Sequence, residues 1–286
     1  MVTLTLALGV VLALALCDGS AKIGPVPTIV LCLAVAFGIN WLAFIPSYLH
    51  RTEHYFDLIG SVTHTTLVVV ALAGSSDIDL RSIFVAAMVG IWALRLGSFL
   101  FFRARKTGGD GRFDTIKHHP GTFFSWWSLQ ALWVFMTGSC ALVIITSTER
   151  QAFGWIAAVG AAMWLIGFIA EVAADLQKSR FRSDPANSAT FIRSGLWAWS
   201  RHPNYFGEIL LWMGIAIMSI PLLSGWRWTA LISPVFVFVL LTRMSGIPIL
   251  ERRGKERWGD DETYQEYLRS TPILLMRKPN AKMKNF

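Results

Sequence analysis

Charged residues are scarce in this sequence. They make up 15% of the 286 residues, whereas hydrophobic residues make up 54%, with 13 Trp and 19 Phe among the aromatic ones. A soluble globular domain usually has about a quarter of its residues charged. The deficit excludes an ordinary soluble domain and places the chain in the membrane class.

Cysteine is also rare, and the common metal and nucleotide motifs are missing. Cys17, Cys32 and Cys140 lie far apart in apolar stretches, so neither a zinc or other metal site nor a disulfide framework is expected. No G-x-G-x-x-G follows a strand pattern, and no G-x-x-x-x-G-K-[ST] occurs. A Rossmann domain and a P-loop are therefore excluded, and any nucleotide must be held by helix ends and loops.

Long apolar runs fill most of the chain. A spanning helix needs about 20 mostly apolar residues. There are eight candidates, or seven if the short first one or one of the last pair does not cross: 2–17, 27–47, 56–74, 82–102, 122–146, 153–173, 206–223 and 228–245. The first has no basic segment before it, so a short helix is expected there rather than a cleaved signal peptide. The sequence predicts an all-α polytopic membrane helix bundle of about seven transmembrane helices, forming a single membrane domain over residues 1–286.

Lys and Arg are distributed unevenly between the two sides of this predicted bundle. With a cytoplasmic N-terminus and eight crossings, 21 of the 26 fall in four segments: 48–55, 103–121, 174–205 and 243–286. Positive residues mark the cytoplasmic side, so these segments are predicted to face the cytoplasm. The same bias explains the net charge of +8 without a nucleic-acid partner, and it favours an anionic, phosphate-rich ligand on that side.

Ionisable residues stand at the ends of several predicted spans, where they usually face a protein interior or a watery cavity. Such residues occur in the stretch 51–57, at Arg95, at Glu171 with Asp175, and at Glu208. The longest polar segments lie on the same predicted side, and long loops in a compact protein are more often functional than idle. The site is therefore expected on that face.

The segment that leads into the seventh apolar run has the most informative pattern. Pro203 is favoured in the first turn of a helix and pushes His202 toward an extended conformation, so a helix is predicted to begin at about residue 203. Asn204 and Glu208 then lie on one face, one turn apart. Arg201 and His202 precede a helix N-terminus, which favours anions. The alternative is a simple helix cap with Glu208 paired to a neighbouring Arg.

The tail after the last apolar run mixes aromatic and basic residues. Arg252 and Arg253 are followed by Trp258, Tyr264 and Tyr267. Aromatic rings among Arg residues can stack on a purine or clamp a phosphate. They can equally form an interfacial belt that anchors the tail to lipid headgroups, and the residues alone leave both interpretations open.

Several motifs together resemble a known family. Residues 195–208, GLWAWSRHPNYFGE, and 264–267, YQEY, resemble the steroid 5-alpha-reductase family, and more closely its bacterial branch with the domain called DUF1295. The motifs EHYFD at 53–57, WALRLG at 92–97 and DGRF at 110–113 fit that branch too. The resemblance covers about residues 50–275 and leaves 1–47 outside. The RHPNYFGE element is shared with other sterol reductases and, more loosely, with isoprenylcysteine carboxyl methyltransferases.

This resemblance implies a bundle of about seven helices that binds NADPH from the cytosol. Asn204 and Glu208 would hold the nicotinamide end, and Arg103 with Arg105 or Lys106 would take phosphates. Arg252, Tyr264 and Tyr267 would lie on the adenosine side. The other cofactor-binding residues implied, most of them in a C-terminal half at about 174–275, are Asp175, Arg182, Trp197, Arg201, His202 and Tyr205.

The expected reaction is hydride transfer from NADPH to the β-carbon of an enone such as a 4-ene-3-oxo steroid. Negative charge develops on the carbonyl oxygen, so a hydrogen-bond donor is needed there. The candidates are Glu53, if burial keeps it protonated, His54 and Asp57, and the sequence does not decide among them. The alternative is that these residues only form a polar turn that caps the third span.

Two rival functions remain open at this point. One is an S-adenosylmethionine-dependent methyltransferase of the isoprenylcysteine or phospholipid type, and the other is a non-catalytic lipid transporter. The absence of an inverted repeat speaks against a transporter. The reductase is expected to be a monomer in the bacterial inner membrane, surrounded by lipid, with its cofactor site facing the cytoplasm and its steroid or lipid-like enone entering from the bilayer.

Overall fold

The computed structural model describes residues 1–107, 111 and 113–279; residues 108–110, 112 and 280–286 lie outside the described part of the chain. Contacts group the chain into two compact units. Unit 1 comprises Met1–Ala158 with Ile215–Ser233, and unit 2 comprises Val159–Gly214 with Pro234–Phe286.

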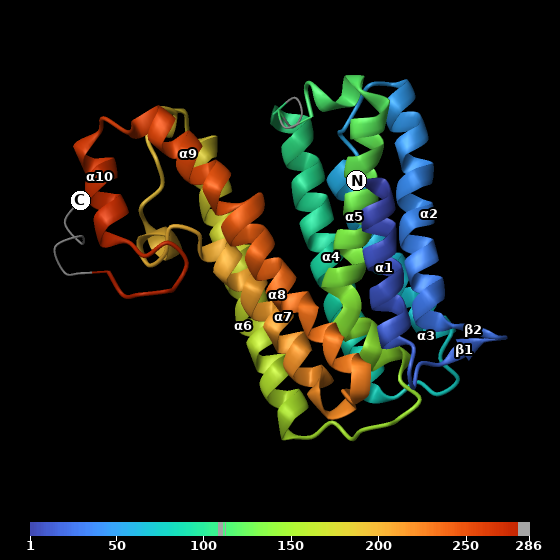
Figure 1. The fold of residues 1–286 in the computed structure, drawn as a ribbon. Coiled ribbons are helices and arrows are strands. Elements are labelled where there is room, and N and C mark those ends of the chain that lie inside the picture. Colours follow the sequence, from blue (N-terminus) through green and yellow to red (C-terminus); the bar gives the residue numbers. More distant parts are fainter. Residues whose placement is uncertain (108–110, 112, 280–286) are drawn as a thin grey trace. The chain divides into compact units, whose positions relative to one another are not determined.

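Unit 1 is a bundle of helices around a central one (Figure 1). Its helices are α1 (Val2–Leu16), α2 (Thr28–Leu49), α3 (Phe56–Ala73), α4 (Leu80–Thr107) and α5 (Pro120–Thr146). A short hairpin of two strands, β1 (Lys22–Ile23) and β2 (Val26–Pro27), joins α1 to α2. Short 3-10 turns lie at Ile116–His118, Ile220–Leu222 and Gly225–Leu231. Helix α5 contacts all four other helices, and 83% of the residues in its most apolar 18-residue stretch are buried. It therefore forms the core of the unit.

A buried amide network joins three helices of unit 1. The Gln130 side chain on α5 donates from Nε2 to Asn40 Oδ1 of α2 at 3.0 Å and to the Phe56 carbonyl of α3 at 2.9 Å. Asn40 in turn donates to Thr63 Oγ1 of α3 at 3.3 Å. Polar groups taken out of water are costly unless they are hydrogen-bonded. These bonds fix the relative register of α2, α3 and α5.

Unit 2 contains most of α6 (Trp155–Ser183), the first part of α7 (Pro203–Ser219), and the C-terminal helices. The latter are α8 (Ile232–Val239), a π-helical turn (Leu240–Met244), α9 (Ile247–Trp258) and α10 (Glu262–Ser270). Short 3-10 turns at Pro185–Asn187 and Gly195–Ala198 lie in the segment that joins α6 to α7. In Figure 1 that segment and α10 lie together at one end of this unit.

Helices α6 and α7 pack backbone against backbone. A Cβ added to Gly207 would lie 2.5 Å from the carbonyl oxygen of Gly167, and one added to Gly167 would lie 2.5 Å from that of Gly207. Two turns further along α7, a Cβ added to Gly214 would lie 2.5 Å from the carbonyl oxygen of Gly160 on α6. Small residues allow such close approach between membrane helices. This packing places the N-terminal end of α7, with the residues 200–202 that lead into it (the α7 entry), beside the C-terminal end of α6.

The predicted class of fold is confirmed. Within the residues described, seven helical stretches are long and apolar enough to cross a membrane, and α1 is a shorter apolar helix of 15 residues. Three helices continue well beyond the predicted apolar runs: α4 to Thr107, α6 to Ser183, and the last helical stretch to Trp258. Hydropathy detects only the apolar part of a helix, and these three continue through polar sequence.

Candidate functional site

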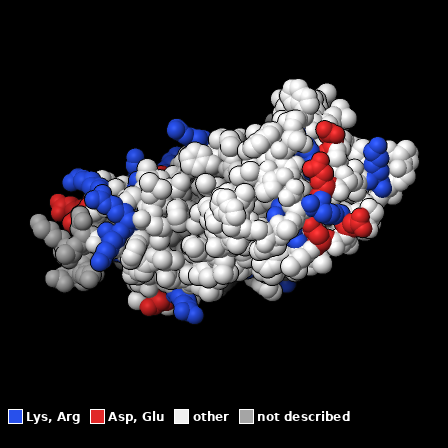
Figure 2. Space-filling model, turned by 90° about the horizontal axis from the view of Figure 1, so that it is seen from below, with Lys and Arg blue, Asp and Glu red and all other residues white. Residues whose placement is uncertain are grey.

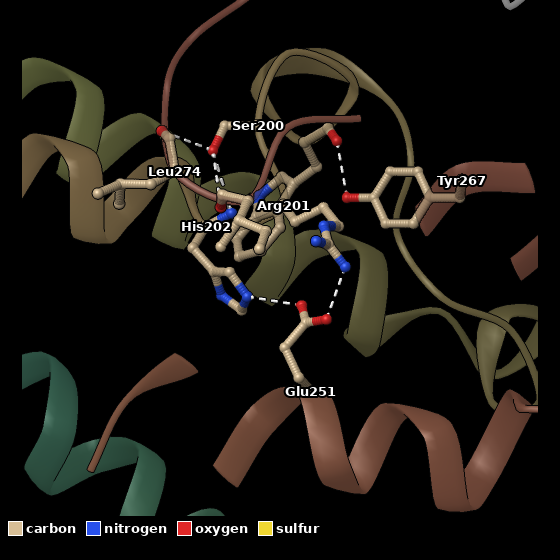
Figure 3. A network of polar contacts seen from close by, with 8 residues as sticks. Ser200, Arg201, His202, Glu251, Tyr267 and Leu274 are labelled. Carbon is tan, nitrogen blue, oxygen red and sulfur yellow. Dashed lines mark hydrogen bonds and ion pairs between the residues drawn. The ribbon is translucent and has the colours of Figure 1, made fainter. Parts of the chain in front are cut away.

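The entry to α7 is built as the sequence predicts. Arg201 and His202 lead into Pro203, the first residue of the helix. The buried hydroxyl of Ser200 accepts a hydrogen bond from the backbone N–H of His202 at 3.2 Å, which caps the turn. Its own proton goes to the Leu274 carbonyl at 2.9 Å (Figure 3). The predicted helix start at about residue 203 is thus confirmed.

A single carboxylate contacts both Arg201 and His202 at this entry. Glu251, which extends from α9, accepts from Arg201 Nη1 at 2.6 Å on one oxygen and lies 3.0 Å from His202 Nε2 on the other (Figure 3). Arg201 and His202 are largely buried, with side-chain exposures of 10% and 6%. The contact spans about fifty residues of sequence, so no local pattern identifies Glu251 as part of the site. Its only signal in the sequence is an acidic residue shortly after the last predicted apolar run.

Burial determines the charge of His202. Loss of hydration lowers its pKa below the ordinary value of 6.5, while the hydrogen bond and charge of Glu251 oppose this shift and Lys178 and Arg201 add to it. The ring of Tyr205 stacks on the imidazole with centroids 5.6 Å apart and planes at 10°. The side chain is therefore a neutral, oriented imidazole at pH 7.

One turn inside, amide and carboxylate groups meet between α6 and α7. Asn204 Nδ2 donates to Asp175 Oδ1 at 3.2 Å. Asp175 and Glu171 on α6 are buried, with 7% and 2% exposure, and Glu208 on α7 is half-buried. The structure thus joins Asn204 and Asp175 directly, at the 29-residue separation that the sequence contains.

The C-terminal segment fastens this entry from outside. The backbone N–H of Arg201 donates to the Pro272 carbonyl at 2.9 Å, and the N–H of Arg277 donates to the Trp199 carbonyl at 3.0 Å. Together with the Ser200–Leu274 bond, these contacts pair the chain after α10 with the chain before α7. The position of Arg201 and His202 therefore depends on residues 272–277.

Tyr264 and Tyr267 lie in a small aromatic core. Their rings pack against Phe191 at centroid distances of 5.0 and 5.4 Å, and Tyr264 also packs against Trp258 at 5.8 Å. The Tyr267 hydroxyl donates to the Trp197 carbonyl at 2.8 Å, and burial raises the pKa of both tyrosines. The rings are used in packing, and their predicted contact with an adenosine stays a prediction.

Three other predicted cofactor residues differ in exposure. Trp197 is buried, donates from Nε1 to the Ala174 carbonyl at 3.0 Å and has the Lys178 ammonium 4.3 Å from its ring centroid. Arg182 and Arg252 are exposed, and Arg252 lies 3.8 Å from Glu256. Trp197 thus supports the site, while the two arginines lie at its surface.

The predicted catalytic residues lie in unit 1, beside a cavity of about 590 Å³. It lies where α2 ends, α3 begins and the last turns of α4 pass. Ten residues line it, and apolar groups predominate: Ala43, Pro46, Ser47, His50, Thr52, His54, Tyr55, Ile59, Phe101 and Arg105. Arg103 is exposed nearby on α4, Lys106 is not described in its side chain, and Asp110 and Arg112 lie outside the described residues. A cavity of this size and lining suits a small apolar ligand.

Among the three candidate acids, only His54 lines the cavity. Glu53 is buried and forms an ion pair with Lys117 at 3.1 Å, and that hydrogen bond raises the pKa of the Lys117 ammonium. An ion-paired carboxylate accepts hydrogen bonds and has no proton to donate. Asp57 stands in the first turn of α3 and is not part of the cavity wall.

The turn that carries these residues is held in an uncommon conformation. Arg51 has a positive φ of 50° and donates to the carbonyls of Lys117 and His118 at 3.3 and 3.1 Å. Residues with side chains adopt this conformation only where surrounding contacts impose it, and such positions cluster at functional sites. The contacts also place residues 48–55 and 113–121 at the same end of unit 1.

Comparisons with known proteins agree with these observations. The 3-oxo-5-alpha-steroid 4-dehydrogenase 1 of Bos taurus is 34% identical over 85 residues, which cover 29% of this chain and 31% of that relative. The chain thus matches about a third of the relative's length. No solved structure matches the chain. A family model described as a protein of unknown function, DUF1295, matches residues 43–271. These include the turn at residues 50–55 beside the cavity and the α7 entry. The chain therefore belongs to the DUF1295 family.

Proposed function

We propose that this protein is an NADPH-dependent reductase of the C=C bond of a 4-ene-3-oxo steroid or a similar lipid enone. The observation that carries the proposal is the α7 entry, where Arg201, His202 and Glu251 surround a helix N-terminus above the Asn204–Asp175 pair. The name of the Bos taurus relative, an oxidoreductase of 3-oxo steroids, supports the same chemistry.

The residues present fit a phosphorylated dinucleotide. Arg201 Nε and His202 Nδ1 are buried and have no hydrogen-bond partner within the described chain. Helix N-termini and Arg groups together favour anions. Asn204 and Glu208 offer an amide and a carboxylate one turn inside, which suits the carboxamide of a nicotinamide. Arg103, Arg105 and Arg252 remain proposed contacts to phosphate and adenosine, and when bound, NADPH would supply the hydride.

His54 is proposed as the group that polarises the substrate carbonyl. Thr52 Oγ1 accepts from the backbone N–H of His54 at 3.3 Å, so its own proton can go to His54 Nδ1, which lies 2.6 Å away. The tautomer so fixed carries its proton on Nε2, which makes that atom a donor. A donor aimed at a developing oxyanion contributes about 3 kcal/mol where the bound substrate excludes water. Solvent or a tyrosine would protonate the α-carbon.

Cofactor binding tests the proposal. A ligand at 100 times its dissociation constant stabilises a protein by about 2.7 kcal/mol. NADPH is expected to raise the unfolding temperature of the purified protein, and NADH to do so less, because it lacks the 2′-phosphate. Stabilisation by S-adenosylmethionine and none by NADPH would instead identify a methyltransferase.

Substitutions at the entry locate the effect. Asn204→Ala and Glu208→Ala are each expected to weaken NADPH binding at least tenfold, since each removes a polar contact in a partly buried site. Asp77→Ala, which changes an exposed carboxylate between α3 and α4, is the control and is expected to bind as the wild type. If Asn204→Ala and Glu208→Ala also bind normally, the cofactor site is misplaced.

A further inference from the structure

The structure offers a role for Glu251 that no motif suggests. Its two carboxylate oxygens are divided between Arg201 and His202, at 2.6 and 3.0 Å, so α9 connects to both residues that precede α7. A carboxylate only accepts hydrogen bonds. The proton of the His202 ring must therefore lie on Nε2 in the neutral imidazole.

The other ring nitrogen is then a hydrogen-bond acceptor. Nδ1 of His202 is buried and finds no partner among the residues that the structure describes. Stacking on Tyr205 holds the plane of the ring, and the bond to Glu251 holds its rotation. Buried polar atoms without partners are uncommon in folded proteins and often mark a ligand or an ordered water.

The charged groups around the ring favour this neutral form. Lys178 and Arg201 both act against a second proton, whereas Glu251 alone favours one. Desolvation adds to the first effect and outweighs the second. If the ring were cationic, Nδ1 would be a hydrogen-bond donor. It would then repel the N–H groups of a ligand and attract its phosphate oxygens instead.

We propose that Glu251 is the positioning residue of this site: it holds His202 as the Nε2–H tautomer, so that Nδ1 accepts a hydrogen bond from an amide or hydroxyl group of the bound nucleotide. The inference rests on the proposed function, since it takes the ligand to be NADPH. Carboxylate groups commonly fix the tautomer of functional histidines in this way.

Nuclear magnetic resonance of the ¹⁵N-histidine-labelled protein reads the tautomer directly. His202 is expected to show a protonated Nε2 and an unprotonated Nδ1, with its signals assigned by their loss in His202→Gln. Addition of NADPH is expected to shift the Nδ1 resonance. A protonated Nδ1 before NADPH is added, or binding of NADPH without any shift at Nδ1, would overturn the proposal; the second result would leave the atom bonded to water only.

Two substitutions separate the two nitrogens. The amide of Gln reaches the place of Nε2, so His202→Gln keeps the bond to Glu251, loses the acceptor, and is expected to bind NADPH about tenfold more weakly. Asn places its oxygen near Nδ1, so His202→Asn loses the bond to Glu251 and is expected to bind more tightly than His202→Gln. The reverse order of affinities contradicts the assignment.

Glu251→Gln tests whether Glu251 acts through His202. The variant removes the charge and can donate to Nε2, so a fraction of His202 is expected to change to the Nδ1–H tautomer, with weaker NADPH binding. An unchanged tautomer would show that Glu251 has only a structural role. If the wild type fails to bind NADPH at all, the proposed function is wrong, and the tautomer of the protein without NADPH still decides the role of Glu251.

Discussion

At the scale of single residues, neighbours in sequence have different tasks. Glu53 and His54 are adjacent, yet the side chain of Glu53 pairs with Lys117 while that of His54 faces the cavity. Sequence patterns identified the group but could not choose within it, because the choice depends on the direction of each side chain. Glu251 was missed for a related reason, since its partners lie about fifty residues away.

The role proposed for His54 predicts a selective loss of rate. His54→Phe keeps a ring at the cavity wall but removes the donor, so kcat is expected to fall by about a hundredfold while NADPH affinity is kept. Steady-state kinetics and cofactor titration measure the two separately. His118→Phe, an exposed histidine outside the cavity lining, is the control. Normal turnover by His54→Phe would remove His54 from the mechanism.

The neutral state of His202 predicts a dependence of stability on pH. Its pKa in the folded protein is lowered, so between that pKa and about 6.5 the unfolded chain binds more protons, and stability falls as the pH falls. The slope is at most about 1.4 kcal/mol per pH unit. Unfolding temperatures of wild type and His202→Gln, measured from pH 7.5 to 5.5, are expected to converge. A gap that widens on acidification would mean a cationic ring.

At the scale of elements, the contact between α6 and α7 determines the geometry of the cofactor site. Pro203 made the start of α7 predictable, since its ring has a strong local preference. The end of α6 was not predictable, because residues 174–183 are polar and carry no apolar signal although they remain helical. That extension places Asp175 on a helix beside Asn204 rather than in a loop.

Gly207→Ala tests this packing. The new methyl group would meet the Gly167 carbonyl and the Glu171 backbone, neither of which can move aside cheaply, so stability is expected to fall by about 1–3 kcal/mol. NADPH binding should weaken as Asn204 and Asp175 move apart. Gly90→Ala on α4, where an added Cβ meets nothing within 4 Å, is the control for thermal unfolding. Equal behaviour of the two variants would refute the close approach.

At the scale of the whole molecule, the distribution of charged side chains is that of a protein embedded in a membrane. On the face drawn in Figure 2, Lys, Arg, Asp and Glu gather in limited areas and most of the surface is uncharged, as helices in lipid require. The apolar runs and the segments between them were predictable because the bilayer imposes one length and one polarity on each span.

The charge bias predicts the sidedness of the protein. A cysteine at Ser188, between α6 and α7, is expected to lie in the cytoplasm, and one at Asp77, between α3 and α4, on the opposite side. In intact cells a membrane-impermeant maleimide should label Asp77→Cys and spare Ser188→Cys until the cells are opened. The native cysteines do not interfere if Cys17, the one that is not fully buried, is first replaced. The reverse labelling would place the cofactor site outside.

The most direct measurement of the central claim follows the hydride itself. Purified protein would be incubated with testosterone or progesterone and NADPH that carries deuterium at both hydrogen positions of C4, and the steroids would then be separated and analysed by mass spectrometry. The account predicts a product with a saturated C=C bond, one deuterium on the β-carbon, and one NADPH consumed per product formed. Unchanged steroid and unconsumed NADPH, in a preparation that NADPH does not stabilise, would contradict it.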